Sequence, residues 1–276
     1  MKLSLIILSC MLPLSLAAQQ PVKSKYNLFR PTPKTEMRDM DTDRPDVTES
    51  PFTVDAGHIQ LETDLLKFEK EKSESTLTKT TLLNQLNIKI GLTNSTSVQM
   101  NLPSYGIQRE TDVESGERTK SKGIGDLTLR VKQNLTGNDH GNFAIAVLPY
   151  LKFPTSKLDD ESRYEGGIII PFQIKLPHDW KLGMELEGSR LKDNEGRQMH
   201  NEFLQALTVS HELLKHLQGI AETYYSYDLK KHHWSNFLNA AMQFDVLDNL
   251  KLDAGLNYGI QYDASNTYFI GASFRM

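Results

Sequence analysis

From Gly57 to the C-terminus, hydrophobic and polar residues alternate along almost the whole chain. The clearest stretch is 250–262, where leucine, alanine, isoleucine and tyrosine fill the even positions, and lysine, aspartate, asparagine, glycine and glutamine fill the odd ones. The same period of two recurs at 126–132, 168–176 and 180–187. Because successive side chains of a strand point to opposite faces, this pattern predicts β-strands with one apolar and one polar face.

About twelve alternating segments follow one another, and most have the ~9–13 residues that a tilted strand needs to cross a bilayer. They lie near 57–69, 79–91, 95–107, 123–135, 142–153, 166–176, 179–190, 200–211, 217–228, 234–246, 249–262 and 266–275. Short connections (91–94, 136–141, 177–179, 213–216, 247–249) alternate with longer polar loops (108–122, 154–165, 191–199).

Short turns at one end and longer loops at the other are typical of barrels that span the bacterial outer membrane. We therefore predict an all-β protein: a closed antiparallel transmembrane β-barrel of about 12 strands, with both chain ends at the short-turn end. A soluble β-sandwich would also alternate, but its strands usually have about five or six residues. Aromatic residues near the strand ends are candidates for interface girdles: Trp180, Tyr225, Tyr227, Tyr258, Tyr262 and Tyr268.

The N-terminus indicates export. Lys2, an apolar run to Leu16 and the small residues before Gln19 are typical of a secretory signal peptide, so we expect residues 1–18 to be removed. Cys10 leaves a lipoprotein alternative open. Residues 19–56 show no periodicity and contain five prolines, which favours an extended N-terminal segment that is either a periplasmic tether or a plug. Residues 57–276 are expected to form the barrel.

Charge and composition narrow the partners. The net charge is −4, and loss of the signal peptide removes one lysine and makes it −5. A mildly acidic chain without a basic block is not expected to bind nucleic acid. The signal region also holds the only cysteine, so no disulfide framework is expected. The expected partners are outer-membrane lipid and a small-molecule solute.

Three stretches resemble a known family. The segment "NLFRPTPKTEMRDMDTDRPDVTESPFTVDAGHIQLETDL" (27–65), with "GIGDLTLRVKQNL" (123–135) and "LPYLKFPTS" (148–156), resembles Gram-negative outer-membrane proteins labelled transporter or putative phenol meta-degradation pathway protein, and Bacteroidetes-type members in particular. The resemblance implies a β-barrel in the cell outer membrane that passes a small, hydrophobic or aromatic solute. The last strand, "YFIGASFRM", resembles the signal read by the barrel-assembly machinery, although it ends on Met276 instead of an aromatic residue.

Charged residues on the polar faces should point into the barrel, because a lysine or arginine facing lipid costs ~2–4 kcal/mol at mid-depth. The candidates that line the lumen are Glu62, Asp64, Lys89, Arg130, Lys132, Lys152, Lys175, Lys181, Glu185, Glu187, Lys251 and Asp253, with Arg275 at the end of the last strand. They could pair with one another and fill the lumen, or they could line a path for a solute.

The charged segment before the first strand supplies the plug candidates Asp43, Arg44, Asp46 and Glu49. We expect Arg44 to pair with an inward carboxylate such as Glu62 or Glu185, because the guanidinium fork suits a bidentate pair.

An enzyme is the main rival class, although we expect no enzyme activity. His233 and Ser235 lie two apart, which resembles the pair on a barrel strand of outer-membrane lipid hydrolases, and Asp263 or Gln261 could orient the base. The histidines lack the spacing of zinc motifs, so we expect neither a metal nor another cofactor. Gly123 and Gly125 precede a strand and not a helix, which indicates a turn. A structural barrel that transports nothing is the third alternative.

Overall fold

The computed structural model describes residues 25–73, 75–158, 162–193 and 198–276. The expected signal peptide at 1–18, including Cys10, lies outside these residues. The strands are β1 (Ile59–Lys72), β2 (Thr76–Gly91), β3 (Thr96–Asp112), β4 (Arg118–Gly123), β5 (Leu127–Thr136), β6 (Phe143–Phe153), β7 (Glu165–Lys175), β8 (Lys181–Lys192), β9 (Met199–Leu214), β10 (Leu217–Asp228), β11 (His233–Leu247), β12 (Leu250–Gly259) and β13 (Asn266–Arg275), preceded by a 3-10 turn, η1 (Lys34–Glu36).

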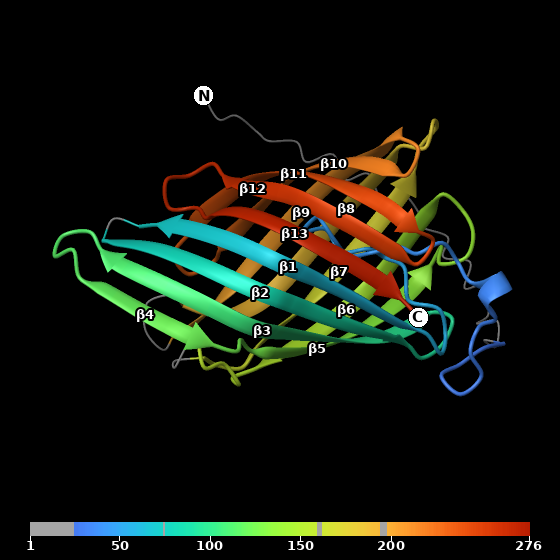
Figure 1. Cartoon of the computed structure of the whole chain (residues 1–276), viewed down its shortest axis with the longest axis horizontal. Helices are drawn as coiled ribbons and strands as arrows, with labels where there is room; N and C mark the ends of the chain where they lie inside the picture. The colour runs from blue at the N-terminus through green and yellow to red at the C-terminus, as the bar shows by residue number, and fades with distance from the viewer. Residues whose placement is uncertain (1–24, 74, 159–161, 194–197) are drawn as a thin grey trace, which may run out of the picture.

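The strands form one closed antiparallel ring (Figure 1). Neighbouring strands pair in sequence order except at β4, where β3 pairs with β5. β1 pairs with β13, and β4 adds to the outer part of β3 without joining the ring. The ring therefore has 12 strands, as the alternation predicted. The C-terminal Met276 exchanges backbone hydrogen bonds with Ile59, and Asn27 bridges Thr93 in the turn after β2, so the C-terminus and the start of the described chain lie at the short-turn end.

One expected loop is a strand pair. The predicted loop at 108–122 contains the end of β3 and all of β4 except its last residue, Gly123. The first strand begins at Ile59, two residues after the predicted start. The Asp112 carboxylate accepts hydrogen bonds from the backbone N–H groups of Glu114 and Ser115 and so closes the turn between β3 and β4. These strands project beyond the ring, where both of their faces contact solvent. Their sequence therefore lacks the alternation of apolar and polar residues seen in the other strands.

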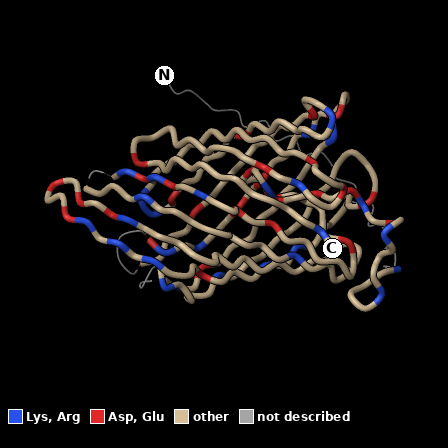
Figure 2. The backbone as a smooth tube through the Cα atoms, in the orientation of Figure 1, with Lys and Arg blue, Asp and Glu red and all other residues tan. Residues whose placement is uncertain are grey.

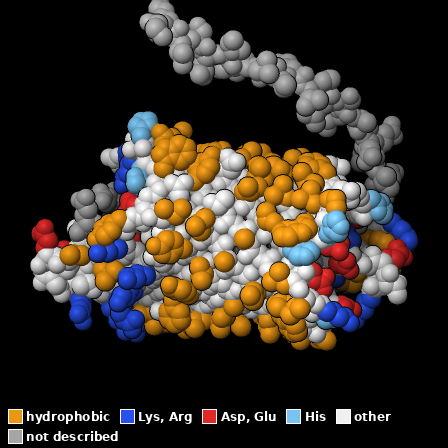
Figure 3. Space-filling model, turned by 90° about the horizontal axis from the view of Figure 1, so that it is seen from above, with side chains coloured by type: hydrophobic (Ala, Val, Ile, Leu, Met, Phe, Trp, Pro, Cys, Tyr) orange, Lys and Arg blue, Asp and Glu red, His pale blue; other side chains and the backbone are white. Residues whose placement is uncertain are grey.

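The outer face of the barrel carries many hydrophobic side chains (Figure 3), and charged positions occur along the strands (Figure 2). Among the most fully buried side chains are Gln60, Glu62, Lys132 and Glu185, while large apolar side chains are exposed on ten of the 12 ring strands, all but β8 and β10. The aromatic residues Trp180, Tyr258, Tyr262 and Tyr268 are all more than 40 % exposed. Polar side chains are thus buried in the lumen and apolar ones are exposed on the outside, which is the reverse of a soluble protein. No helix among the described residues is long and apolar enough to cross a membrane.

Candidate functional site

The interior of the barrel holds a stretch of the N-terminal chain, residues 38–55, which we call the lumen segment. Its side chains or backbone groups form hydrogen bonds or ion pairs with residues of β1, β2, β3, β5, β8, β10, β11, β12 and β13. Only a segment that crosses the inside of the ring can reach strands on all its sides. The sequence is compatible with a tether or a plug in this region; in the structure its charges lie in the lumen.

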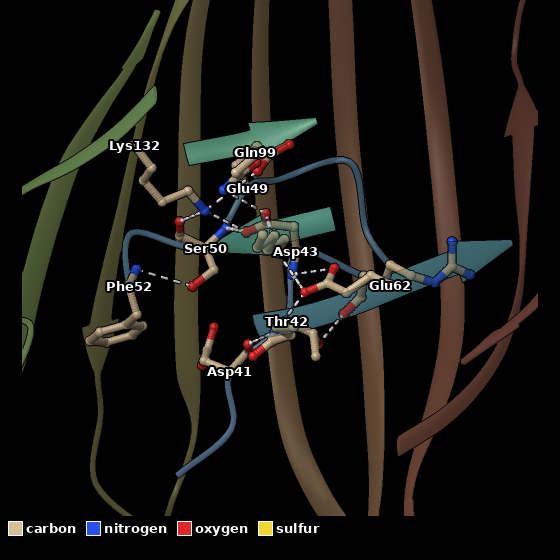
Figure 4. Close-up of polar contacts among 12 residues, drawn as sticks. Asp41, Thr42, Asp43, Glu49, Ser50, Phe52, Glu62, Gln99 and Lys132 are labelled. Carbon is tan, nitrogen blue, oxygen red and sulfur yellow. Dashed lines mark hydrogen bonds and ion pairs between the residues drawn. The ribbon is translucent and has the colours of Figure 1, made fainter. Parts of the chain in front are cut away.

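Asp43 is the hub of one polar cluster (Figure 4). Its carboxylate pairs with Lys89 on β2 and with Lys132 on β5, at 2.6 Å between Lys132 Nζ and Asp43 Oδ1. Its backbone N–H donates to Glu62 on β1 at 3.1 Å, and the Ser50 N–H donates to its Oδ1 at 3.0 Å. All five side chains are buried, so each charge meets an opposite charge away from bulk water.

Arg44 joins two strands on the other side of the segment. Its Nη1 lies 2.6 Å from Asp64 Oδ1 on β1, and its Nη2 and Nε donate to the two oxygens of Asp253 on β12 at 2.6 and 3.2 Å. The bidentate geometry is the expected one, but the expected partners Glu62 and Glu185 are wrong. Those two carboxylates instead accept the backbone N–H groups of Asp43 and Glu49.

The Arg44 guanidinium fits because Gly271 on β13 has no side chain. A Cβ at position 271 would lie 2.1 Å from Arg44 Nη2. Gly271→Val should therefore push the guanidinium off Asp253 and increase the frequency of channel openings in planar bilayers. Gly188→Val is the matched control, since a Cβ at Gly188 on β8 meets nothing within 4 Å. Equal opening frequencies in the two variants would contradict a role for the Arg44 contact in holding the segment.

Glu49 and Glu185 fix the far part of the segment. The Glu49 carboxylate pairs with Arg130 and lies 3.5 Å from Lys132 Nζ, both on β5. Its backbone N–H donates to Glu185 Oε2 on β8 at 2.6 Å. Through this one residue the segment links β5 and β8, which are three strands apart in the ring.

Glu222 on β10 is a contact that the sequence analysis missed. Its two carboxylate oxygens accept the backbone N–H groups of Val47 and Thr48 at 2.9 and 2.7 Å, and also the Thr48 hydroxyl at 2.6 Å. A signal was present: Glu222 is the only charged residue inside β10 before its final Asp228, so the cost of facing lipid already directs it inward.

The remaining candidates lie away from the segment's ion pairs. Asp46 lies beside the Thr208 hydroxyl and Glu222. Lys152 pairs with Glu165, Glu187 accepts the Tyr150 hydroxyl at 2.7 Å, and Lys251 lies 3.0 Å from Asp245. Lys181 lines the cavity described next, and Lys175 is exposed at the end of β7.

The short-turn end of the lumen opens into a cavity of about 1350 Å³ between the lumen segment and the walls from β7 to β13. At its edge, Asp55 accepts from Arg38 at 2.9 Å and from Arg275 at 3.0 Å, while Arg275 also donates to the Arg38 carbonyl at 2.8 Å. The lumen segment therefore forms the floor of this cavity. Arg275, at the end of the last strand, binds both ends of the segment through Asp55 and the Arg38 carbonyl.

The residues of the rival hydrolase form only part of a catalytic arrangement. His233 Nε2 lies 3.2 Å from Asp263 Oδ2, whereas Gln261 accepts the Asn236 backbone N–H. Within the described part of the chain, Ser235 has no hydrogen bond to His233. An orienting carboxylate is present, but a base–nucleophile contact is not.

A closed ring with an apolar outer surface and a charged, segment-filled interior defines an outer-membrane β-barrel, because a membrane-spanning sheet must satisfy every backbone group by closing on itself. The chain belongs to the family described as "Putative MetA-pathway of phenol degradation", whose sequence profile matches residues 42–276. The short-turn end, with the cavity and Met276, accordingly faces the periplasm.

Solved structures support the fold. The COG4313 outer membrane channel from Pseudomonas putida F1 superposes with a TM-score of 0.60 at 10% identity, covering 86% of this chain and 100% of that one. The NanC porin superposes with a TM-score of 0.51 at 11% identity, covering 78% of this chain and 100% of that one. At these identities the similarity concerns the fold. A search of the curated proteins finds no match.

Proposed function

We propose that this protein is an outer-membrane channel whose pore the lumen segment occludes, and that it passes a small, hydrophobic or aromatic solute when the segment moves. In this proposal residues 1–18 are the signal peptide, 19–56 the extension that carries the plug, and 57–276 the barrel. The barrel would lie in outer-membrane lipid after insertion by the barrel-assembly machinery.

One observation carries the proposal: the lumen segment fills the interior without being part of the wall. None of its residues pairs in the strands of the ring; only the parallel bridge between Ala56 and Gly91 joins the wall directly after it. It is held by ion pairs and by hydrogen bonds in which at least one partner is a side chain. Such contacts can be exchanged for water without opening the sheet, so the segment can leave while the barrel stays closed.

The nature of the solute is inferred from the family. The description of the family names phenol degradation, and two barrels of similar fold are a channel and a porin. The inner wall above the segment also offers apolar surface, since the rings of Tyr224 on β10 and Phe237 on β11 stack with centroids 4.5 Å apart. An aromatic solute can pack against such rings more favourably than a sugar can.

Liposomes that contain the purified barrel test this function. We expect faster entry of small aromatic solutes than of aliphatic solutes of matched size, relative to empty liposomes, and no lipid breakdown. Lipid cleavage that Ser235→Ala abolishes would instead establish the hydrolase. If a variant without residues 19–50 shows neither solute uptake nor lipid cleavage, the protein is a structural barrel that transports nothing.

A further inference from the structure

Three neighbouring strands reverse their faces at one height. Leu65 on β1 is an extra residue relative to β13, since Asp64 pairs with Gly271 and Leu66 with Ile270. Asn84 on β2 lies opposite Leu65, and Ser104 on β3 lies opposite Asn84. These residues are skipped together in the pairing, so each of the three strands carries one extra residue at this height. Gly271 faces Arg44 in the lumen and Ile270 is 48% exposed, so Leu66 faces outward although Asp64 faces inward. An added residue of this kind is a β-bulge, and it shifts every later side chain to the other face.

Beyond the bulges, the reversal brings basic residues to the outer face. Lys70 pairs with Lys79, Lys79 with Arg109, and Arg109 with Lys120, so one row of four cations crosses β1, β2, β3 and β4. Directly opposite side chains on a sheet have Cβ atoms ~4.5–5.5 Å apart, and like charges there repel. All four residues are exposed, and within the described part of the chain none has an ion-pair partner. Figure 2 shows Lys and Arg positions gathered along the projecting ends of these strands.

The two faces of this projection carry different charges. The outer face of the three rows around the four cations also holds Lys72, Arg118 and Lys122, and it holds no acidic residue. The acidic residues Glu69, Glu71 and Glu110 take the inner face of the same strands. Because the acidic residues lie on the opposite face, they cannot form salt bridges with these cations, and the repulsion between the cations remains. The outer face is thus a seven-cation surface, which we call the basic row.

The basic row lies just above the lipid-facing apolar surface. Phe68 and Tyr268 pair with each other one outward position below Lys70, and both are about half exposed. One step of two residues along a strand is ~6.6 Å. Lys72 also packs over the Tyr262 ring, with 4.5 Å from Nζ to the centroid, an arrangement suited to the membrane interface. The row therefore lies at the depth of the outer headgroups.

We propose that the basic row binds the phosphate groups of the glycolipid that forms the outer leaflet, a bisphosphorylated lipid A. Phosphate oxygens accept charge-assisted hydrogen bonds from lysine and arginine. A ligand with two phosphates on one rigid headgroup can bridge neighbouring cations and remove the repulsion along the row. A protein partner would need a dense acidic surface at the same depth, where the lipid headgroups already lie.

Native mass spectrometry of the purified barrel in detergent, with bisphosphorylated lipid A added, tests the proposal. Lys79→Gln combined with Arg109→Gln should weaken lipid A binding by about tenfold or more, since each lost contact is charge-assisted. The matched control removes two exposed cations elsewhere, with Lys215→Gln and Lys231→Gln, and should bind like the parent. The heat-modified gel shift reports that each variant is folded.

The source of the phosphate is tested in parallel. Dephosphorylated lipid A should bind the parent as weakly as it binds the Lys79/Arg109 variant, and inorganic phosphate at the same concentration should not displace lipid A. Equal lipid A binding by the parent and the Lys79/Arg109 variant would overturn the proposal. So would displacement by inorganic phosphate alone, which would indicate a surface that attracts any anion.

Discussion

Deletion of residues 19–50 should raise the single-channel conductance of this barrel severalfold. The deletion removes Asp43, Arg44 and Glu49, whose ion pairs reach β1, β2, β5 and β12, but it removes no residue of the ring. Lys132 and Arg130 lose their carboxylate partners. Because water then enters the lumen and solvates both cations, the deletion opens a path without burying unpaired charge.

A shorter deletion is the control for that result. Removal of residues 19–37 takes away η1 and the bridge at Asn27 but keeps the lumen segment and its ion pairs. This variant should conduct like the parent in planar bilayers. If the two deletions give equal conductance, the lumen segment is not what restricts the pore, and the tether interpretation of residues 19–56 stands.

Replacing Asp43 by Asn should release the lumen segment without removing it. Lys89 and Lys132 share this buried carboxylate. Lys89 keeps Glu62 as a partner and Lys132 keeps Glu49 at 3.5 Å, so the substitution should cost less than the roughly 3–5 kcal/mol of a buried charge left with no partner. Release of the segment relieves that cost by letting water reach both lysines. We expect longer openings in bilayers and cleavage of residues 38–50 by added protease, while the ring keeps its heat-modified gel shift.

Asp41→Asn is the matched control, since Asp41 lies two residues away and its backbone carbonyl, not its carboxylate, accepts the Gln60 side chain. Adding Lys132→Gln to Asp43→Asn should restore part of the closed state, because it removes the lysine that has lost its nearest carboxylate. The double-mutant cycle then measures the coupling between the two residues. Additive effects of the two substitutions would show that they do not act on one contact.

The sequence was sufficient for the ring because one physical rule, burial of charge away from lipid, acts at every strand. It could not supply the partners of Arg44. Asp64 and Asp253 are distant in sequence, and they come together only because closure places β13 between β1 and β12. The choice between them and Glu62 or Glu185 depends on the path of an aperiodic segment.

The alternation also fails beyond the bulges. Continued from the buried residues Glu62, Lys89 and Gln99, a strict period of two would place Lys70, Lys79 and Arg109 inside the barrel. The extra residues Leu65, Asn84 and Ser104 reverse that outcome. Asn84 has a positive φ of 53°, which asparagine tolerates, but the sequence does not mark Leu65 as an irregularity. Sequence patterns report the faces of a strand only between such irregularities.

The lumen segment also has a consequence for the order of events during assembly. It lies directly before the first strand, yet its contacts reach the second-last and last strands through Asp253 and Arg275. Those partners come into position only when β1 and β13 meet, so the segment can become ordered only after the ring is complete. Contacts of such long sequence separation form late in folding. In an unfinished barrel this charged stretch would therefore stay in the periplasm, where proteases can reach it. Protection of the segment from proteases would report that the ring has closed.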